Sequence, residues 1–138
     1  MVATGSSPTR RVAVTGGSGA VGRTTVRHLM DAGYDVVVLD RVNRTQAPFV
    51  DVDVRDLDAL MAALDGADAV VHFAADPRAD AAGDASRGAA LFAGNTAATF
   101  SVMWAVGHLG IPRLVWASSQ QVFGWPWQRI SPVYLPLD

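Results

Sequence analysis

The sequence has 138 residues, a formal net charge of −2 and no cysteine, and half of its residues are hydrophobic. This length fits one domain with a sizeable core, and the weak negative charge argues against a nucleic-acid or anionic-membrane surface. The lack of cysteine excludes disulfides and thiolate chemistry, and no stretch looks apolar over the ~18 residues that a membrane span requires. Residues 1–10 lack the apolar core of a signal peptide, so we expect a disordered leader on a cytoplasmic protein.

The first half of the chain predicts three strands and one helix. Arg11–Thr15 is a short β-branched run that ends in glycines, which is typical of a buried strand. A helix is expected over Ala20–Ala32, with Gly33 as its C-terminal stop. Asp35–Leu39 is an apolar second strand, and Phe49–Val52 is a weaker third one.

The second half continues the alternation of helices and strands. A short helix with an aspartate cap is expected over Asp56–Leu64, followed by a strand over Ala67–Ala74. The small residues of 76–88 indicate a mobile loop. The longest helix is expected over Leu91–Leu109, and a fifth strand over Arg113–Ala117.

This alternation predicts the fold class. Strands that are continuous apolar runs, separated by helices, indicate an α/β fold with a doubly wound parallel sheet that is covered on both faces. Right-handed crossovers make 3-2-1-4-5 the expected strand order. We therefore expect one domain over 11–124, followed by an irregular tail over 125–138.

A glycine-rich turn joins the first strand to the first helix. Gly16 permits the tight turn, Gly19 lets a pyrophosphate approach the backbone, and Gly22 lets the helix pack closely on the sheet. Asp40 ends the second strand 18 residues after Gly22, where an acid can bind the ribose hydroxyls of a dinucleotide. A carboxylate there favours NAD over NADP, although the adjacent Arg41 could pair with a 2′-phosphate.

Five segments, taken together and in order, resemble the extended short-chain dehydrogenases/reductases, in their nucleotide-sugar epimerase and dehydratase group. The segments are Thr15–Gly22, Asp53–Asp56, Val71–Ala75, Asn95 and Leu114–Gly124. The resemblance implies a Rossmann fold whose C-terminal substrate lobe is absent from this sequence. It also implies an NAD site formed by Gly16, Gly19, Ala20, Val21, Gly22, Asp40, Arg41, Asp53, Val54, Phe73, Ala74, Ala75 and Asn95.

By the same resemblance, Ser119 is the catalytic serine, which would hydrogen-bond the reacting oxygen of a sugar substrate. The family's proton shuttle is a Tyr-x-x-x-Lys pair, but Tyr134 is followed four residues later by Asp138, and the chain contains no lysine at all. Phe123 also stands where the family has a tyrosine. Two hypotheses follow: a truncated piece of an NAD-dependent oxidoreductase, epimerase or dehydratase acting on a sugar or nucleotide sugar, or a non-catalytic dinucleotide-binding or sensor module.

The remaining candidates are weaker. His72 lies within an apolar strand and is expected to be a core or cofactor-lining residue rather than a base. The other histidines have no clustered partners, so no metal site is expected. The 91–109 helix is apolar around much of its circumference, which fits either a homodimer seam or burial against a missing half. Trp125 and Trp127 are expected to pack against that missing half rather than to stack on a sugar.

Overall fold

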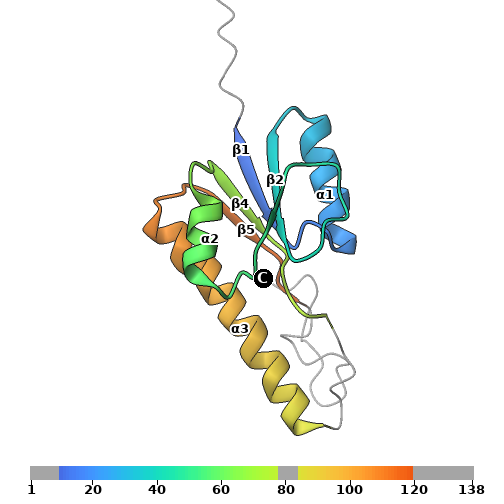
Figure 1. Cartoon of the computed structure of the whole chain (residues 1–138), viewed down its shortest axis with the longest axis vertical. Helices are drawn as coiled ribbons and strands as arrows, with labels where there is room; N and C mark the ends of the chain where they lie inside the picture. Colours follow the sequence, from blue (N-terminus) through green and yellow to red (C-terminus); the bar gives the residue numbers. More distant parts are fainter. Residues whose placement is uncertain (1–9, 78–83, 120–138) are drawn as a thin grey trace, which may run out of the picture.

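The computed structural model describes residues 10–77 and 84–119. Within these ranges a single parallel sheet has the order β3-β2-β1-β4-β5 (Figure 1), which confirms the predicted strand order. The strands are β1 (Arg11–Thr15), β2 (Asp35–Asp40), β3 (Phe49–Asp51), β4 (Ala69–His72) and β5 (Leu114–Trp116). The predicted leader, apart from Arg10, and the predicted tail over 125–138 lie outside the described residues.

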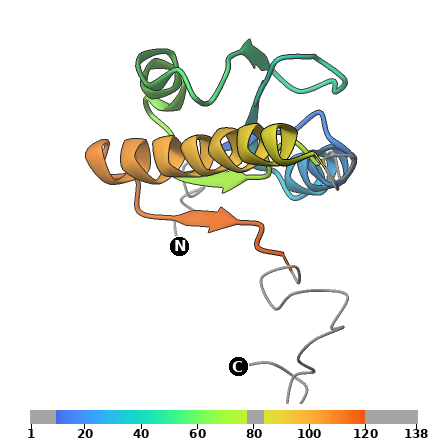
Figure 2. The same ribbon diagram turned by 90° about the horizontal axis from the view of Figure 1, so that it is seen from below.

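Three helices cover the two faces of the sheet. They are α1 (Ala20–Asp31), α2 (Leu57–Leu64) and α3 (Ala85–His108). Figures 1 and 2 show α1 on one face and α2 with α3 on the other. The alternation of side chains along a strand produces this arrangement: Val12 and Val14 belong to the apolar cluster that contains Val26 of α1, whereas Ala13 belongs to the cluster that contains Leu60 of α2.

The prediction for α3 was wrong at its N-terminal end. The helix begins at Ala85 rather than Leu91, so the last residues of the expected loop are helical. Asp84 explains the early start, because its carboxylate accepts hydrogen bonds from the backbone N–H groups of Ser86 and Arg87, at 3.0 and 3.1 Å. This cap compensates for Gly88, which costs a helix about 1 kcal/mol relative to alanine.

The expectation that no stretch is apolar enough to cross a membrane was also wrong. In the described part of the chain, α3 is long and apolar enough to cross a membrane, because one stretch of 18 residues within it has a mean hydropathy of 1.3. The alanines and larger apolar residues that raise this mean are interspersed with polar residues and glycines, so they do not form a continuous apolar run in the sequence. A core helix meets the same criterion, and Ala98, Val102 and Ala105 of α3 are buried in the domain.

Candidate functional site

The loop between β1 and α1 lies at the carboxyl edge of the sheet. Gly16 has a φ of +68°, and a Cβ atom on it would lie 2.5 Å from the backbone nitrogen of Ala74. The loop therefore runs directly against the segment that follows β4, which only a glycine permits. The Gly16 N–H donates to the carbonyl of Leu39 at 2.9 Å, so β2 also holds the loop.

Two further glycines of the loop have different surroundings. A Cβ atom on Gly22 would lie 2.2 Å from the carbonyl oxygen of Gly16, so this position lets α1 approach the loop closely. A Cβ atom on Gly19 would meet only that same oxygen, at 3.2 Å. Gly19 is the N-cap of α1 and provides no side-chain cap, so the first N–H groups of the helix face the loop without a capping side chain.

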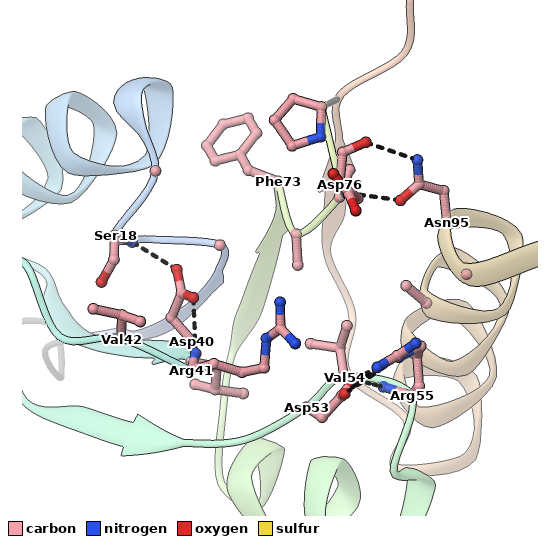
Figure 3. A pocket seen from close by; sticks show the side chains of 18 of the residues that line it. Ser18, Asp40, Arg41, Val42, Asp53, Val54, Arg55, Phe73, Asp76 and Asn95 are labelled. Carbon is pink, nitrogen blue, oxygen red and sulfur yellow. Dashed lines mark hydrogen bonds and ion pairs between the residues drawn. The ribbon is translucent and has the colours of Figure 1, made fainter. Parts of the chain in front are cut away.

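A cavity of about 930 Å³ opens beside this loop, at the carboxyl ends of β1, β2 and β4 and against α3 (Figure 3). Parallel sheets bind ligands at this edge, where the strand order reverses. Most of the predicted cofactor residues line the cavity: Gly16, Gly19, Asp40, Arg41, Asp53, Val54, Phe73, Ala74, Ala75 and Asn95. Ala20, Val21, Gly22 and Ser119 are not among its described lining residues.

Ser119 lies three residues after the end of β5, on the same carboxyl edge of the sheet as the cavity, and it is exposed. Phe123, Tyr134 and both tryptophans of the predicted tail lie outside the described residues. The structure thus brings together the nucleotide-binding candidates, while the role of Ser119 stays a prediction.

Asp40 is fixed in place by backbone donors. One carboxylate oxygen accepts from the Ser18 N–H at 3.0 Å, and the other accepts from the Arg41 N–H at 2.8 Å. Ser18 is buried, and its hydroxyl accepts from the Arg44 N–H at 3.2 Å. The phosphate loop, the end of β2 and the segment after it are therefore linked through two short side chains, and Figure 3 shows Asp40 and Ser18 together at one wall of the cavity.

Asp53 and Arg55, which follow β3, form an ion pair in the lining of the cavity. The Arg55 Nε donates to the Asp53 carboxylate at 2.9 Å, and the Arg55 backbone N–H donates to it at 3.0 Å. The side-chain hydrogen bond from Arg55, together with this backbone hydrogen bond, lowers the pKa of Asp53 to about 2. Asp53 is consequently ionised across the neutral range, with its charge matched by a neighbouring guanidinium.

We expect this pair to be visible in an acid titration. The Asp53 carboxyl should titrate near pH 2, and Arg55→Ala should raise its pKa toward the usual value for aspartate. Because the folded pKa lies below the unfolded one, the stability from the pair is present above about pH 4 and is lost as the pH falls toward about 2. Its contribution is small because both side chains are substantially exposed. Carboxyl-carbon NMR measures the pKa directly, and equal values in wild type and Arg55→Ala would contradict the assignment.

Asn95 forms hydrogen bonds with the backbone of the segment after β4. Its Oδ1 accepts from the Asp76 N–H at 2.8 Å, and its Nδ2 donates to the Asp76 carbonyl at 3.1 Å. These two bonds join the middle of α3 to the chain that leaves β4, as the dashed lines of Figure 3 show. The prediction placed Asn95 at the cofactor; the structure shows a lining residue whose amide group is bound to the protein backbone.

Sequence reasoning missed several lining residues. The polar ones are Ser18, Arg44, Arg55, Asp76 and Arg87, and the apolar ones include Leu39, Val42, Val52, Pro77 and Leu91. Arg55 lies within the segment Asp53–Asp56, which resembles the family, and its spacing from Asp53 was the available signal. Arg87 could not be found, because its place depends on the early start of α3. Within the described residues, no group of three or more histidines and acids could hold a metal ion.

A family model and individual proteins of similar sequence point to the same family. Residues 12–134 match the NAD dependent epimerase/dehydratase family. An L-arabinose 1-dehydrogenase (NAD(P)(+)) from Haloferax volcanii is 42% identical over 112 residues, which cover 81% of this chain and 42% of that protein. UDP-glucose 4-epimerase 2 from Arabidopsis thaliana is 31% identical over 137 residues, covering 85% of this chain and 38% of the epimerase.

A solved structure supports the same fold. UDP-glucose 4-epimerase from Brucella ovis, crystallised in complex with NAD, superposes with a TM-score of 0.79 and 26% identity, covering 93% of this chain and 39% of that one. This chain thus spans about 40% of the length of the proteins that it matches.

Proposed function

Because the chain belongs to the NAD-dependent epimerase/dehydratase family, we propose that it holds NAD for an oxidoreductase, epimerase or dehydratase that acts on a sugar or nucleotide sugar. The observation that supports this most directly is the cavity at the carboxyl edge of the sheet, bordered by a glycine loop and a fixed carboxylate. The relatives named above, an L-arabinose dehydrogenase and UDP-glucose epimerases, support the substrate class.

The described residues fit such a cofactor. Gly16 and Gly22 let the loop pack closely against the segment after β4 and against α1, and the uncapped start of α1 offers N–H groups of Ala20 and Val21 to a pyrophosphate. Across the cavity, the remaining proposed contacts are Asp40 and Arg41 to the adenosine ribose, Asp53 and Val54 to adenine, and Phe73, Ala74, Ala75 and Asn95 along the nicotinamide side. NAD, when bound, would accept or return a hydride from a sugar carbon.

The chain should bind NAD more tightly than NADP. The Asp40 carboxylate would lie where a 2′-phosphate of NADP has to fit, and its two backbone donors prevent it from turning away. We expect at least a tenfold preference, which corresponds to about 1.4 kcal/mol. Titration of both cofactors by calorimetry measures it.

The matched variant is Asp40→Asn, which keeps the side-chain shape but removes the negative charge. It should bring the two affinities closer together, because Arg41 then meets the phosphate without a competing acid. Tighter binding of NADP than of NAD by the wild-type chain would contradict the proposed role of Asp40.

Ser119 is proposed to orient the substrate oxygen, and the 138 residues alone should not turn a sugar over. Removing a hydride from a sugar carbinol also requires a base for the hydroxyl proton, and a free tyrosine with a pKa near 10 is a poor base at neutral pH. Tyr34 lies before β2, at the edge of the sheet opposite the cavity, and no lysine is available to assist Tyr134. We therefore expect NAD binding without multi-turnover NADH formation, measured by absorbance with a panel of aldoses and UDP-sugars.

Sustained NADH formation by the 138 residues would contradict this prediction. A longer coding sequence that supplies a Tyr-x-x-x-Lys pair should restore turnover, and Ser119→Ala in that protein should reduce it by roughly 100-fold to 1,000-fold. A longer protein that binds NAD and remains inactive would instead favour the second candidate, a non-catalytic dinucleotide-binding or sensor module.

A homodimer through α3 and a cytoplasmic location complete the proposal. Four large side chains of α3 are exposed in the described chain: Phe92, Phe100, Met103 and Trp104. The exposed fractions of Phe92 and Phe100, 73% and 64%, are unusual for phenylalanine on a solvated helix and suit a surface that another helix covers.

A further inference from the structure

His72 occupies an unusual place at the end of β4. The residue is only 4% exposed, and its ring contacts side chains of two other elements. Its Nδ1 lies 2.6 Å from the Thr15 hydroxyl at the end of β1, and its Nε2 lies 3.4 Å from the Thr99 hydroxyl on α3. In either neutral tautomer the ring can donate to one threonine and accept from the other, so both bonds are made whichever nitrogen bears the proton.

An apolar residue would be the simpler choice for this position. Val70 and Val71 precede His72 in the same strand, and Val70 is fully buried. An imidazole loses hydration on burial, and this burial lowers the pKa of His72, so the ring is neutral at physiological pH. The ring is retained in place by hydrogen bonds that reach two elements at once, which a valine or leucine could not make.

Each partner of His72 is adjacent to a wall of the proposed NAD cavity. Thr15 directly precedes Gly16, where the phosphate loop starts. Thr99 is one helical turn after Asn95, whose amide holds the Asp76 backbone. Phe73 and Ala74, which follow His72, line the cavity, and the Phe73 N–H donates to the Thr15 carbonyl at 2.9 Å.

The phosphate loop and the segment after β4 have little room to move relative to each other. The distance of 2.5 Å from a Gly16 Cβ position to the Ala74 nitrogen shows that the loop and the segment after β4 are in direct backbone contact. A displacement of β4 relative to β1 or α3 would therefore change the width of the cavity. A bridge at its floor can control that width without touching a ligand.

We propose that His72 is a positioning residue for the NAD site, which sets the spacing between the phosphate loop and the Asn95 wall by bridging Thr15 and Thr99. This inference rests on the proposed function, since NAD is the ligand that the spacing would serve.

The test uses the whole 138-residue chain and two variants, each of which removes the hydrogen bond between His72 and Thr99. His72→Asn keeps an acceptor in reach of Thr15 but is too short for Thr99, and Thr99→Val removes the other end of that second bond. Each should weaken NAD binding by about tenfold in calorimetry, and the double variant should lose no more than either single one. Ser101→Ala, at a buried polar residue two positions further along α3, is the control and should retain wild-type affinity.

All affinities are to be measured at a temperature where circular dichroism shows each variant fully folded. Wild-type affinity in both single variants, or fully additive losses in the double variant, would overturn the positioning role. A non-specific effect of removing a polar group from the buried face of α3 would weaken NAD binding in Ser101→Ala as well.

A second measurement separates this inference from the proposed function. In ¹⁵N-correlation spectra of the chain without ligand, His72→Asn should shift the backbone amide of Gly16 and the side-chain amide of Asn95 together, with Ser101→Ala as the reference. Unchanged signals at both sites would refute the bridge even if NAD binds. Absence of NAD binding by the wild-type chain would refute the proposed function, and the spectra would still decide whether His72 couples the two walls.

Discussion

Gly19→Val should abolish NAD binding and leave the fold intact. Gly19 is in an extended conformation with a φ of −69°, which valine adopts without strain, and a Cβ atom there meets one carbonyl oxygen at 3.2 Å. The domain can therefore accept the side chain with a small adjustment. The valine methyl groups, however, would occupy the space in front of the first N–H groups of α1, where the pyrophosphate has to lie. We expect affinity to fall by more than roughly 100-fold, or about 2.7 kcal/mol.

Calorimetry with NAD, combined with urea unfolding of the same samples, checks both halves of this prediction. Gly107→Val is the matched control, because a Cβ atom at Gly107 meets nothing within 4 Å and the residue lies on the last turns of α3. It should bind NAD as the wild type does. Unchanged affinity in Gly19→Val would mean that the pyrophosphate lies elsewhere.

Gly22→Ala should have the opposite profile, with a large loss of stability. The added Cβ would lie 2.2 Å from the Gly16 carbonyl oxygen and 2.7 Å from the Gly17 Cα. Both atoms belong to the backbone, so no side-chain rotation can relieve the clash, and α1 has to move away from the sheet. We expect the free energy of unfolding to fall by about 3 kcal/mol, at the upper end for overpacking by one methyl group.

Urea unfolding monitored by circular dichroism gives this value. Gly88→Ala is the control, because Gly88 is helical and a Cβ atom on it meets nothing within 4 Å. That substitution should leave stability unchanged or raise it by about 0.5–1 kcal/mol. Equal stability of Gly22→Ala and the wild type would show that α1 is less closely packed on the loop than the structure has it.

The parts of the fold that could be predicted are those that depend on local patterns. The predicted strand Arg11–Thr15 has the same first and last residues as β1. Gly33 follows the end of α1, as expected, with a φ of +83°. Continuous apolar strands have to be covered by helices on both faces of the sheet. Right-handed crossovers then allow only a few strand orders, and the expected order is one of them. The cavity residues Gly16 and Asp40 were found because each directly follows a predicted strand.

The parts that could not be predicted depend on pairings between distant residues. The start of α3 is set by Asp84, which in the sequence is one of several aspartates in a stretch of small residues. The two hydrogen bonds between the Asn95 amide and the Asp76 backbone could not be expected, because a backbone partner has no signature in a sequence. The contact of His72 with Thr15 and Thr99 joins residues far apart in the chain, so only the folded arrangement reveals it.

The length of α3 has a consequence for how the domain opens. Its buried residues, from Ala98 to Val106, all lie in the second half, whereas the first half extends beyond the sheet (Figure 1) with no fully buried side chain. Amide protons of the first turns should then exchange with solvent through local fraying, while those of the last turns exchange only when the whole domain unfolds. A ligand held against Leu91 and Gly94 would slow exchange in the first half selectively, and so the helix would report occupancy of the cavity at one end and global stability at the other.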